Sequence, residues 1–381
     1  MQSIAQAWLV LKISDSGAAL GIVTALQYLP VMLFGMLGGV AADRYPKRTV
    51  LFCTQAASAM LALILGFLVA ASLVTLWMVF VLAFCLGLVN VFDNPARQSF
   101  VIEMVGEGDL RNAVTLYSTL INLSRVIGPA VAGILITFIG IAPCFILNGL
   151  SYIAVLVMLA LMKTEELHLS PPSPRTGGQL REGILYMLST PVLRNTLIMM
   201  SLVGTFTFEF QVSLPLIARY VFHGNAGSFA FLSGCLGIGA VIGGLVIAGK
   251  KKNSPAILIT VGFLFGSAVL AASFMPTLLL TGFMLVFTGA CMIFFTSLGN
   301  IIIQLGSSPQ MRGRVMSFWT IAFLGTTTFG GPAVGALAEA AGPRWGLALG
   351  GAAALAAALW GFFTLRHVHT GFDGVKKAGD S

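Results

Sequence analysis

The sequence predicts an all-α integral membrane protein made of two six-helix bundles, and three observations lead to this prediction. Of its 381 residues, 57% are hydrophobic and 9% are charged, whereas soluble domains carry about 25% charged residues. The mean hydropathy is +0.95. Long apolar runs recur along the chain, and several motifs repeat about 203 residues apart. This composition excludes a soluble enzyme, a secreted disulfide scaffold and a disordered chain.

The membrane spans follow from the lengths of the apolar runs. A helix that crosses the bilayer needs about 20 apolar residues. Eleven stretches satisfy this requirement: 19–42, 50–71, 74–93, 112–138, 142–162, 196–218, 227–249, 255–275, 277–300, 315–338 and 344–365. The apolar stretch 1–13 is too short to cross. By comparison with the second half, we interpret it as the end of an incomplete helix 1 whose start precedes Met1.

The positive charges predict how the spans are oriented. If the charged links face the cytoplasm, 17 of the 21 Lys and Arg residues lie inside and Arg125 lies within a span. Three lie outside: Lys12, Arg219 and Arg344. Positive residues favour the cytoplasmic side, so we expect a multi-pass protein of the cell membrane with its C-terminus in the cytoplasm.

The domain boundaries follow from the same pattern. We expect an N-terminal membrane bundle at 1–162, a cytoplasmic linker at 163–194, a C-terminal membrane bundle at 195–366 and a cytoplasmic tail at 367–381. The linker is rich in proline and glycine and then becomes amphipathic, which is also compatible with a helix lying on the membrane surface.

Several functional classes find no support in the sequence. The net charge of +8 is not gathered into a basic stripe with aromatic residues, so we expect no nucleic-acid partner. The five cysteines are odd in number and lie in or beside apolar runs, which favours packing over disulfides or a metal. No phosphate-binding loop with Gly-Lys-Ser/Thr is present, so ATP is not expected to drive the protein. We expect no cofactor and no enzymatic activity.

The repeated motifs divide the chain into two similar halves. A glycine pair with three intervening residues recurs at an offset of 204, and two further elements recur at 203. The matched elements are Gly35/Gly39 with Gly239/Gly243, Arg111 with Arg314, and Gly128-Pro129 with Gly331-Pro332. Such internal duplication is typical of secondary transporters.

The segment 39–51 resembles the signature loop between helices 2 and 3 of the major facilitator superfamily. Ala41 and Pro46 depart from its pattern, and the matching residues are Gly39, Ala42, Asp43, Arg44, Lys47, Arg48 and Leu51. The resemblance implies that this loop is a gating latch between the two halves, in which Asp43 contacts an arginine or a helix N-terminus. A charged turn that only sets the topology is the alternative.

Other motifs resemble the branch of this superfamily that contains the enterobactin exporter and the macrolide efflux proteins. They are Asp93-Asn94-Pro95-Ala96-Arg97-Gln98, Arg125-Val126-Ile127-Gly128-Pro129 and Met311-Arg312-Gly313-Arg314-Val315-Met316. The resemblance implies a monomeric secondary exporter of a siderophore or hydrophobic drug, coupled to protons. Read by local pattern alone, Asp93 followed by Asn94 and Pro95 predicts the start of a helix.

Two charged residues fall near the middle of predicted spans, where charge is costly and usually functional. We expect Arg125 and Glu209 to line a central cavity. Glu209 would bind a proton or a cationic substrate, or else be a neutral, hydrogen-bonded acid packed between helices. Arg125 would hold an anionic or polar substrate group, pair with Glu209, or cap helix carbonyls. Asn122 lies one turn before Arg125 and is a weaker candidate.

The glycine and proline residues of helix 5 predict a bend or a close helix crossing. Proline removes a backbone hydrogen bond and glycine lets helices approach. The residues concerned are Gly128, Pro129 and Gly133, with Gly331 and Pro332 as their counterparts in helix 11. A gating role and a plain packing role both remain open.

Taken together, these patterns predict an exporter of a small amphipathic solute that works by alternating access and proton antiport. An uptake or lipid transporter of the same fold is one alternative. An inactive or sensory remnant is another, because helix 1 is incomplete. Nothing in the sequence encodes the direction of transport.

Overall fold

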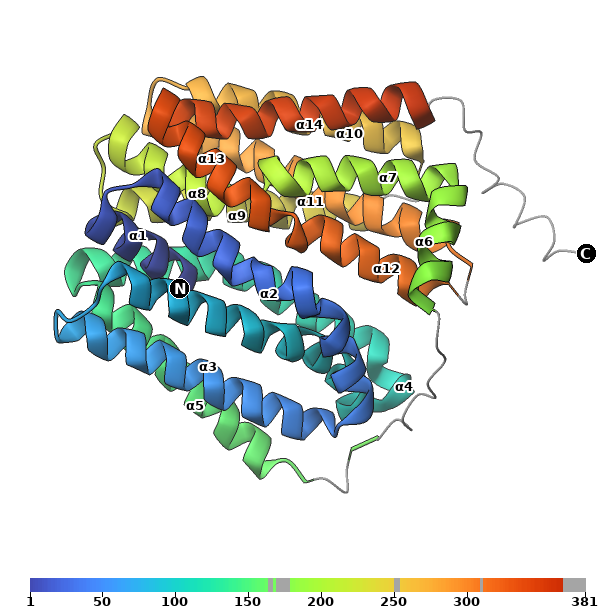
Figure 1. Ribbon diagram of the computed structural model, residues 1–381, viewed down its shortest axis with the longest axis horizontal. Helices are drawn as coiled ribbons and strands as arrows, with labels where there is room; N and C mark the ends of the chain where they lie inside the picture. The colour runs from blue at the N-terminus through green and yellow to red at the C-terminus, as the bar shows by residue number, and fades with distance from the viewer. Residues whose placement is uncertain (164–166, 169–178, 250–253, 309–310, 366–381) are drawn as a thin grey trace, which may run out of the picture.

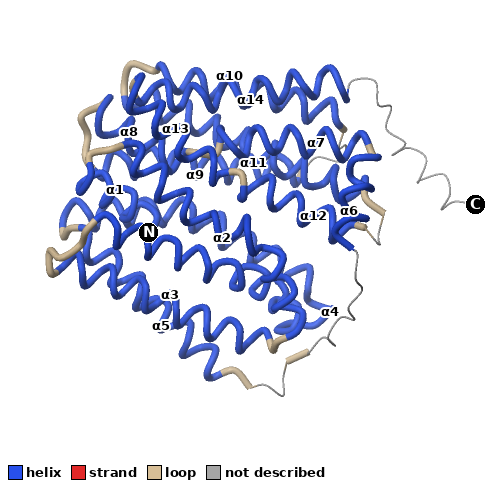
Figure 2. The backbone as a smooth tube through the Cα atoms, in the orientation of Figure 1, coloured by secondary structure: helices blue, strands red, loops and turns tan. Residues whose placement is uncertain are grey.

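The computed structural model describes residues 1–163, 167–168, 179–249, 254–308 and 311–365. Within these ranges all regular structure is helical and there is no strand. The helices form two groups that lie one against the other, α1–α5 and α7–α14, as Figures 1 and 2 show. The prediction of an all-α protein with two bundles is confirmed, and the tail at 367–381 lies outside the described residues.

The first bundle contains five helices, one of which holds two of the predicted spans. These helices are α1 (Gln2–Ser14), α2 (Gly17–Arg44), α3 (Lys47–Ala70), α4 (Leu76–Phe138) and α5 (Ile141–Leu161). The long helix α4 kinks at Gly106, whose φ of 69° lies in the left-handed region that glycine adopts most easily. No helix begins at Asp93, so the prediction of a helix start there is wrong.

The second bundle contains two interrupted spans. Its elements are α7 (Pro191–Leu202), η2 (Val203–Thr207), α8 (Phe210–Leu216), η3 (Ile217–Val221), α9 (Ala226–Ala248), α10 (Pro255–Phe274), α11 (Leu278–Gly306), α12 (Arg312–Thr320), η4 (Ile321–Gly325), α13 (Thr327–Ala341) and α14 (Pro343–Leu365). The three η elements are π-helical turns, which frequently mark functional sites.

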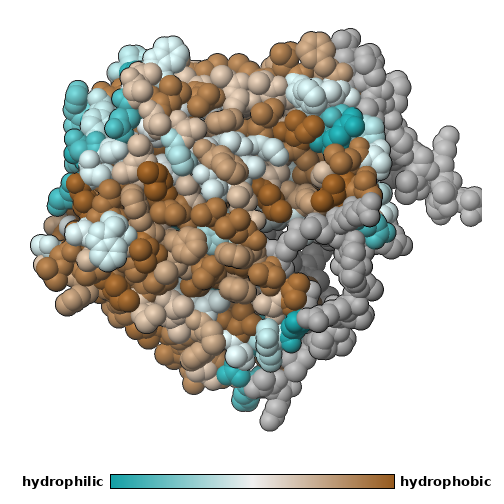
Figure 3. Space-filling model, in the orientation of Figure 1, coloured by the Kyte–Doolittle hydropathy of each residue, from teal (hydrophilic) through white to brown (hydrophobic). Residues whose placement is uncertain are grey.

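Ten helical segments in the described ranges are long and apolar enough to cross a membrane. The eleventh predicted span, 112–138, is the second part of α4, of which Leu123–Phe138 forms a shorter apolar helix. The helix α1 has 13 residues, fewer than a span needs. Figure 3 shows a broad hydrophobic belt with hydrophilic residues concentrated toward the two ends of the molecule, the surface that a bilayer requires.

A short helix, α6 (Gln179–Ser189), lies in the predicted linker and packs beside the second bundle (Figure 1). The hydroxyl oxygen of its Tyr186 accepts a hydrogen bond from the backbone N–H of Ser308 at 3.0 Å. Residues 164–166 and 169–178 of the linker are outside the described residues. We call the end of the molecule that carries α6 the linker end.

The two bundles meet where the repeated glycines lie. The helix α2 packs on α13, and α4 packs on α9. A Cβ on Gly21 would lie 2.3 Å from the carbonyl oxygen of Gly331, and a Cβ on Gly133 would lie 2.3 Å from the Cβ of Ala230. Because both distances are too short for a side chain, the glycines permit close crossing. Glycines of α2, α13 and α4 therefore lie at the two contacts between the bundles.

Candidate functional site

Three of the cavities between the bundles have polar side chains that bear on a candidate site. The central cavity has a volume of about 280 Å³ and is lined by Met1 and by residues of α1, α4, α8, α9 and α11, among them Arg125, Gln211 and Ser233. A second cavity of about 510 Å³, here called the Arg125 cleft, lies between α4 and the helices α9, α11 and α12. A third of about 400 Å³, the α2–α12 cleft, is lined by α2, α4, α12 and η4.

Arg125 lies on the walls of both the central cavity and the Arg125 cleft. Its backbone is held tightly, because a Cβ on Gly237 of α9 would lie 2.6 Å from the carbonyl oxygen of Arg125. Its side chain is exposed. Among the described residues no carboxylate lies within ion-pair distance, and the guanidinium caps no helix carbonyl. Arg125 and Glu209 are therefore not paired in this structure.

Glu209 lies at a break in the seventh span. The π-helical turn η2 ends at Thr207, and α8 begins at Phe210. Between them Phe208 and Glu209 leave the helical range, with ψ values of 7° and 35°. Interrupted helices near the middle of the membrane are where many transporters bind their ions and substrates.

The carboxyl group of Glu209 is buried against α13, and the residue is 2% exposed. A Cβ on Gly330 would lie 2.9 Å from its Oε1, and one on Gly331 would lie 3.4 Å from its Oε2. Two consecutive glycines thus make room for this carboxyl. It faces away from the central cavity, although the next two residues, Phe210 and Gln211, line that cavity.

Neither carboxyl oxygen of Glu209 has a hydrogen-bond partner in the described part of the chain. The Thr327 hydroxyl lies beside the carboxyl, close enough to stabilise its charge, and is also 3.4 Å from the carbonyl oxygen of Gly204. Tyr28 of α2 lies close enough to interact electrostatically with the carboxyl. A buried carboxylate without partners is costly, so this pocket accommodates the uncharged acid more readily than the anion. Glu209 therefore lies beside Gly331, the residue at which α13 crosses α2 of the other bundle.

Two basic residues of the signature loop make contacts within their own bundle. Lys47 forms an ion pair with Glu103 at 2.5 Å, and Arg48 donates to the carbonyl oxygens of Leu159 at 2.8 Å and Ala160 at 3.0 Å. These contacts join α3 to α4 and to the end of α5. Arg44 is exposed.

Two predicted residues can be placed only by their backbone. Asp43 lies in the last turn of α2 and Asn122 lies in α4, and the side chains of both are outside the described part of the structure. Gly39, the first residue of the loop motif, lines the α2–α12 cleft. A Cβ there would meet nothing within 4 Å.

The helix-bending residues are divided between the cavity and the interface. Pro129 lines the central cavity, whereas Gly133 packs on α9. Gly331 and Pro332 pack on α2, where a Cβ on Gly21 would lie 2.8 Å from the Cα of Pro332. A Cβ on Gly128 would make an ordinary van der Waals contact with the Met1 nitrogen at 3.5 Å.

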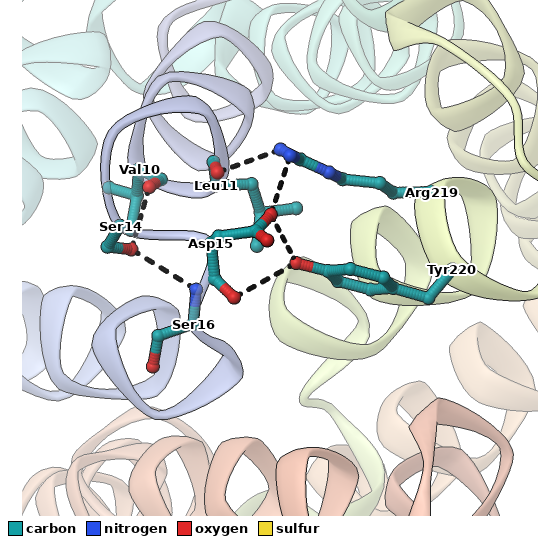
Figure 4. A network of polar contacts seen from close by, with 7 residues as sticks. All are labelled: Val10, Leu11, Ser14, Asp15, Ser16, Arg219 and Tyr220. Carbon is teal, nitrogen blue, oxygen red and sulfur yellow. Dashed lines mark hydrogen bonds and ion pairs between the residues drawn. The ribbon is translucent and has the colours of Figure 1, made fainter.

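The end opposite α6 is closed by polar contacts between the bundles (Figure 4). Arg219 of η3 forms an ion pair with Asp15 at 2.6 Å and donates to the carbonyl oxygen of Leu11 at 2.7 Å. The hydroxyl of Tyr220 donates to Asp15 Oδ1 at 2.7 Å. We call this the closed end.

A second contact at the closed end links α13 to the start of α2. The carboxylate of Glu339 accepts hydrogen bonds from the Ser16 hydroxyl at 2.8 Å and from the backbone N–H of Ala18 at 2.9 Å. It thus caps the N-terminus of a helix in the other bundle, where an anion is favoured. Sequence analysis missed this contact, because the two residues are 323 positions apart.

Asp93 is another residue whose role the sequence pattern did not reveal. It is 1% exposed. Its Oδ1 accepts hydrogen bonds from the Thr54 hydroxyl at 2.8 Å and from the Gln55 amide at 2.7 Å, and its Oδ2 pairs with Arg97. Asp93 therefore ties α3 to α4 inside the first bundle.

Comparisons with known proteins agree with this architecture. Residues 1–372 match the family model described as transmembrane secretion effector. The chain belongs to this family, a branch of the major facilitator superfamily. It is a membrane transporter and not an enzyme.

Named relatives include efflux proteins. The chain is 27% identical over 279 residues to the staphyloferrin A transporter of Staphylococcus aureus, covering 70% of this chain and 68% of that one. It is 26% identical over 377 residues to the multidrug efflux pump Tap of Mycolicibacterium fortuitum, and this match covers 94% of this chain and 86% of Tap. Macrolide efflux protein A of Streptococcus pyogenes is 21% identical over 314 residues, covering 80% and 76%.

Solved structures show the same fold. A bacterial homologue of the human lysosomal transporter Spinster has a TM-score of 0.71 at 16% identity, covering 96% of this chain and 92% of that chain. A POT family transporter in complex with 5-aminolevulinic acid has a TM-score of 0.75 at 13% identity, covering 97% and 94%.

Proposed function

We propose that the protein exports a small amphipathic solute across the cytoplasmic membrane by alternating access, with protons moving in the opposite direction. The observation that carries this proposal is the asymmetry of the space between the bundles. Solute-sized cavities with polar lining residues lie between them toward the linker end. Toward the other end the cavity between α4 and α9, of about 480 Å³, has a mainly apolar lining, and contacts between Arg219 and Asp15 and between Glu339 and α2 hold the bundles together. The efflux functions named for several relatives support export.

The linker end faces the cytoplasm in this proposal. The positively charged loop Arg44–Arg48 lies there, and cytoplasmic loops carry the excess of Lys and Arg. The structure then corresponds to an inward-facing state, which takes up solute from the cell. Opening the closed end would require the contacts of Asp15, Arg219 and Glu339 to break.

Glu209 is the proposed proton site. A charged carboxyl in its pocket lacks hydrogen-bond partners, whereas a protonated one removes the cost of a buried charge. The carboxyl contacts Gly330 and Gly331 of α13, the helix that crosses α2 of the other bundle. Gain or loss of its proton therefore acts directly on the contact between the bundles. The break at Phe208–Glu209 lets α8 move together with that contact.

Transport by inside-out membrane vesicles tests this function. A pH gradient with an acidic interior is imposed on vesicles that contain the protein. The accumulation of each of a series of labelled toxic compounds inside them is then measured. We expect at least one compound to accumulate and to leak out when the pH gradient is collapsed. The same assay in right-side-out vesicles separates export from uptake. Absence of gradient-driven accumulation across the scan, in membranes shown to contain folded protein, would contradict the proposal.

The Glu209→Gln variant tests the proton site. The amide keeps the size of the side chain but cannot release a proton, so we expect uphill transport to be lost while solute exchange without a gradient continues. Glu182→Gln on α6 is the matched control, since it removes an exposed acid outside the cavities. Uphill transport by Glu209→Gln with the pH dependence of the unmodified protein would remove Glu209 from the mechanism.

A further inference from the structure

The walls of the cavities carry charge of one sign. Among the described residues that line the central cavity and the Arg125 cleft, Arg125 is the one ionisable side chain. The described lining of the α2–α12 cleft contains none. The acid nearest in sequence to the lining of the central cavity, Glu209, points toward α13 and is 2% exposed. A solute in these cavities therefore meets a cation and no exposed anion.

The positive charge of Arg125 creates a problem for the transport cycle. In this structure its side chain is exposed and lacks a carboxylate partner among the described residues. Closing the linker end would remove water from around the guanidinium, and an unpaired charge in a dry, low-dielectric cavity is costly. A bound anion would neutralise that charge, whereas a bound cation would add to it.

We infer that the transported solute is an organic anion, whose carboxylate binds Arg125 and whose apolar body lies in the central cavity. This inference rests on the proposed function and names its substrate class. Guanidinium groups bind carboxylates through two parallel hydrogen bonds. Phe229, Leu236 and Met292 provide the apolar wall beside Arg125.

Neutral polar groups near Arg125 complete the site. Ser233 lines the central cavity and Asn300 lines the Arg125 cleft. The Asn300 carbonyl oxygen is already occupied, because it accepts a hydrogen bond from the Gln304 amide at 2.5 Å. The Asn300 NH₂ group therefore remains as a donor. Donors around a guanidinium suit a carboxylate, which only accepts hydrogen bonds.

A matched pair of dyes tests the sign of the preferred charge. Fluorescein and rhodamine 123 share a xanthene ring system, but near neutral pH the first is an anion and the second a cation. Their binding to the purified protein is measured by fluorescence anisotropy. We expect fluorescein to bind more tightly than rhodamine 123. Arg125→Gln should weaken fluorescein binding by about tenfold or more, and Arg125→Lys should weaken it less.

The control is Arg194→Gln on α7. This residue is exposed and lines none of the three cavities, and its contact within the described part of the chain is a 3.5 Å hydrogen bond to the Leu188 carbonyl oxygen. Loss of its charge should leave fluorescein binding unchanged. If Arg194→Gln weakens binding as much as Arg125→Gln does, the effect is one of overall charge and the assigned site is wrong.

Other outcomes separate this inference from the proposed function. Tighter binding of rhodamine 123 than of fluorescein, or equal fluorescein binding by Arg125→Gln and the unmodified protein, would overturn the anion site. Gradient-driven transport of rhodamine 123 would also overturn the anion site, but it would agree with the proposal that the protein is an exporter. Arg125-dependent fluorescein binding without any gradient-driven transport would support the site and contradict the proposed coupling.

Discussion

At the scale of single residues, the proposed site depends on two ionisable side chains, Arg125 and Glu209. They point to different places: the first to the cavities, and the second to α13. Arg125 faces the cavities from α4, and Glu209 is enclosed between the seventh span and α13. Phe210 and Gln211, which follow Glu209 directly in the sequence, line the central cavity. A change in the charge of Glu209 can therefore reach the solute through a single turn of helix.

Sequence analysis located both residues, since charge within an apolar run is easily recognised. It did not reveal where their side chains point. It expected Glu209 on the cavity wall, whereas the carboxyl occupies the space left by Gly330 and Gly331. That space depends on a helix more than a hundred residues away, so the local pattern around Glu209 contains no sign of it.

Gly330 provides a prediction at this scale. A Cβ there would lie 1.4 Å from the carbonyl oxygen of Thr205 and 2.9 Å from the carboxyl of Glu209. We therefore expect Gly330→Val to lower the apparent unfolding temperature of the purified protein by about 5 °C or more. Gly39→Val is the control, because a Cβ at Gly39 would meet no atom within 4 Å. Equal unfolding temperatures for the two variants would contradict the described packing of α13 on the seventh span.

At the scale of the elements, the duplicated Gly-Pro segments show what a repeat predicts. The offset of 203 residues indicated that Gly128-Pro129 and Gly331-Pro332 have corresponding positions. Gly331-Pro332 lie at the crossing of α13 with α2, whereas Pro129 lines the central cavity and Gly133, in the next turn, packs on α9. The interruptions of the seventh and eleventh spans were not predicted. Hydropathy detects an apolar run, but it does not detect a π-helical turn within it.

The contacts of Asp93 give a prediction for the first bundle. Asp93→Asn keeps the shape of the side chain but removes the charge that pairs with Arg97 and accepts from Thr54 and Gln55. Without the carboxylate charge, the side chains of Arg97, Thr54 and Gln55 lose part of their hydrogen bonding, so we expect the protein to unfold at a lower temperature. Binding of fluorescein should change less than in Arg125→Gln, because Asp93 lines none of the three cavities. A stability equal to that of the unmodified protein would contradict this structural role.

The ion pair at the closed end gives a second prediction for the elements. Asp15 is well exposed, so its pair with Arg219 is weak, and its loss should shift the balance between the two states by about two- to fivefold. We expect Asp15→Asn to increase the outward-open population. Distances between spin labels on the outer ends of α2 and α13 measure this population. Lys12→Gln is the control, and an unchanged distance distribution in Asp15→Asn would show that the pair does not hold this end closed.

At the scale of the whole molecule, composition and run length were enough to predict the class of fold, and the repeated motifs added the two bundles. The long-range contacts were not predictable in the same way. The ion pair of Arg219 with Asp15 and the cap of Glu339 on α2 join residues that are more than 200 positions apart. Such pairs arise from how the bundles meet, and a single sequence does not contain that geometry.

The central claim is that the two bundles must separate at the closed end during each cycle. Ser16→Cys and Glu339→Cys, whose native side chains are 2.8 Å apart, place thiols on opposite sides of that end. The five native cysteines are first replaced. The thiols are then joined by a short, reducible bifunctional reagent, and gradient-driven transport is measured before and after reduction. We predict loss of transport in the cross-linked double variant, recovery after reduction, and no loss in either treated single variant; full transport by the cross-linked protein would contradict alternating access at this interface.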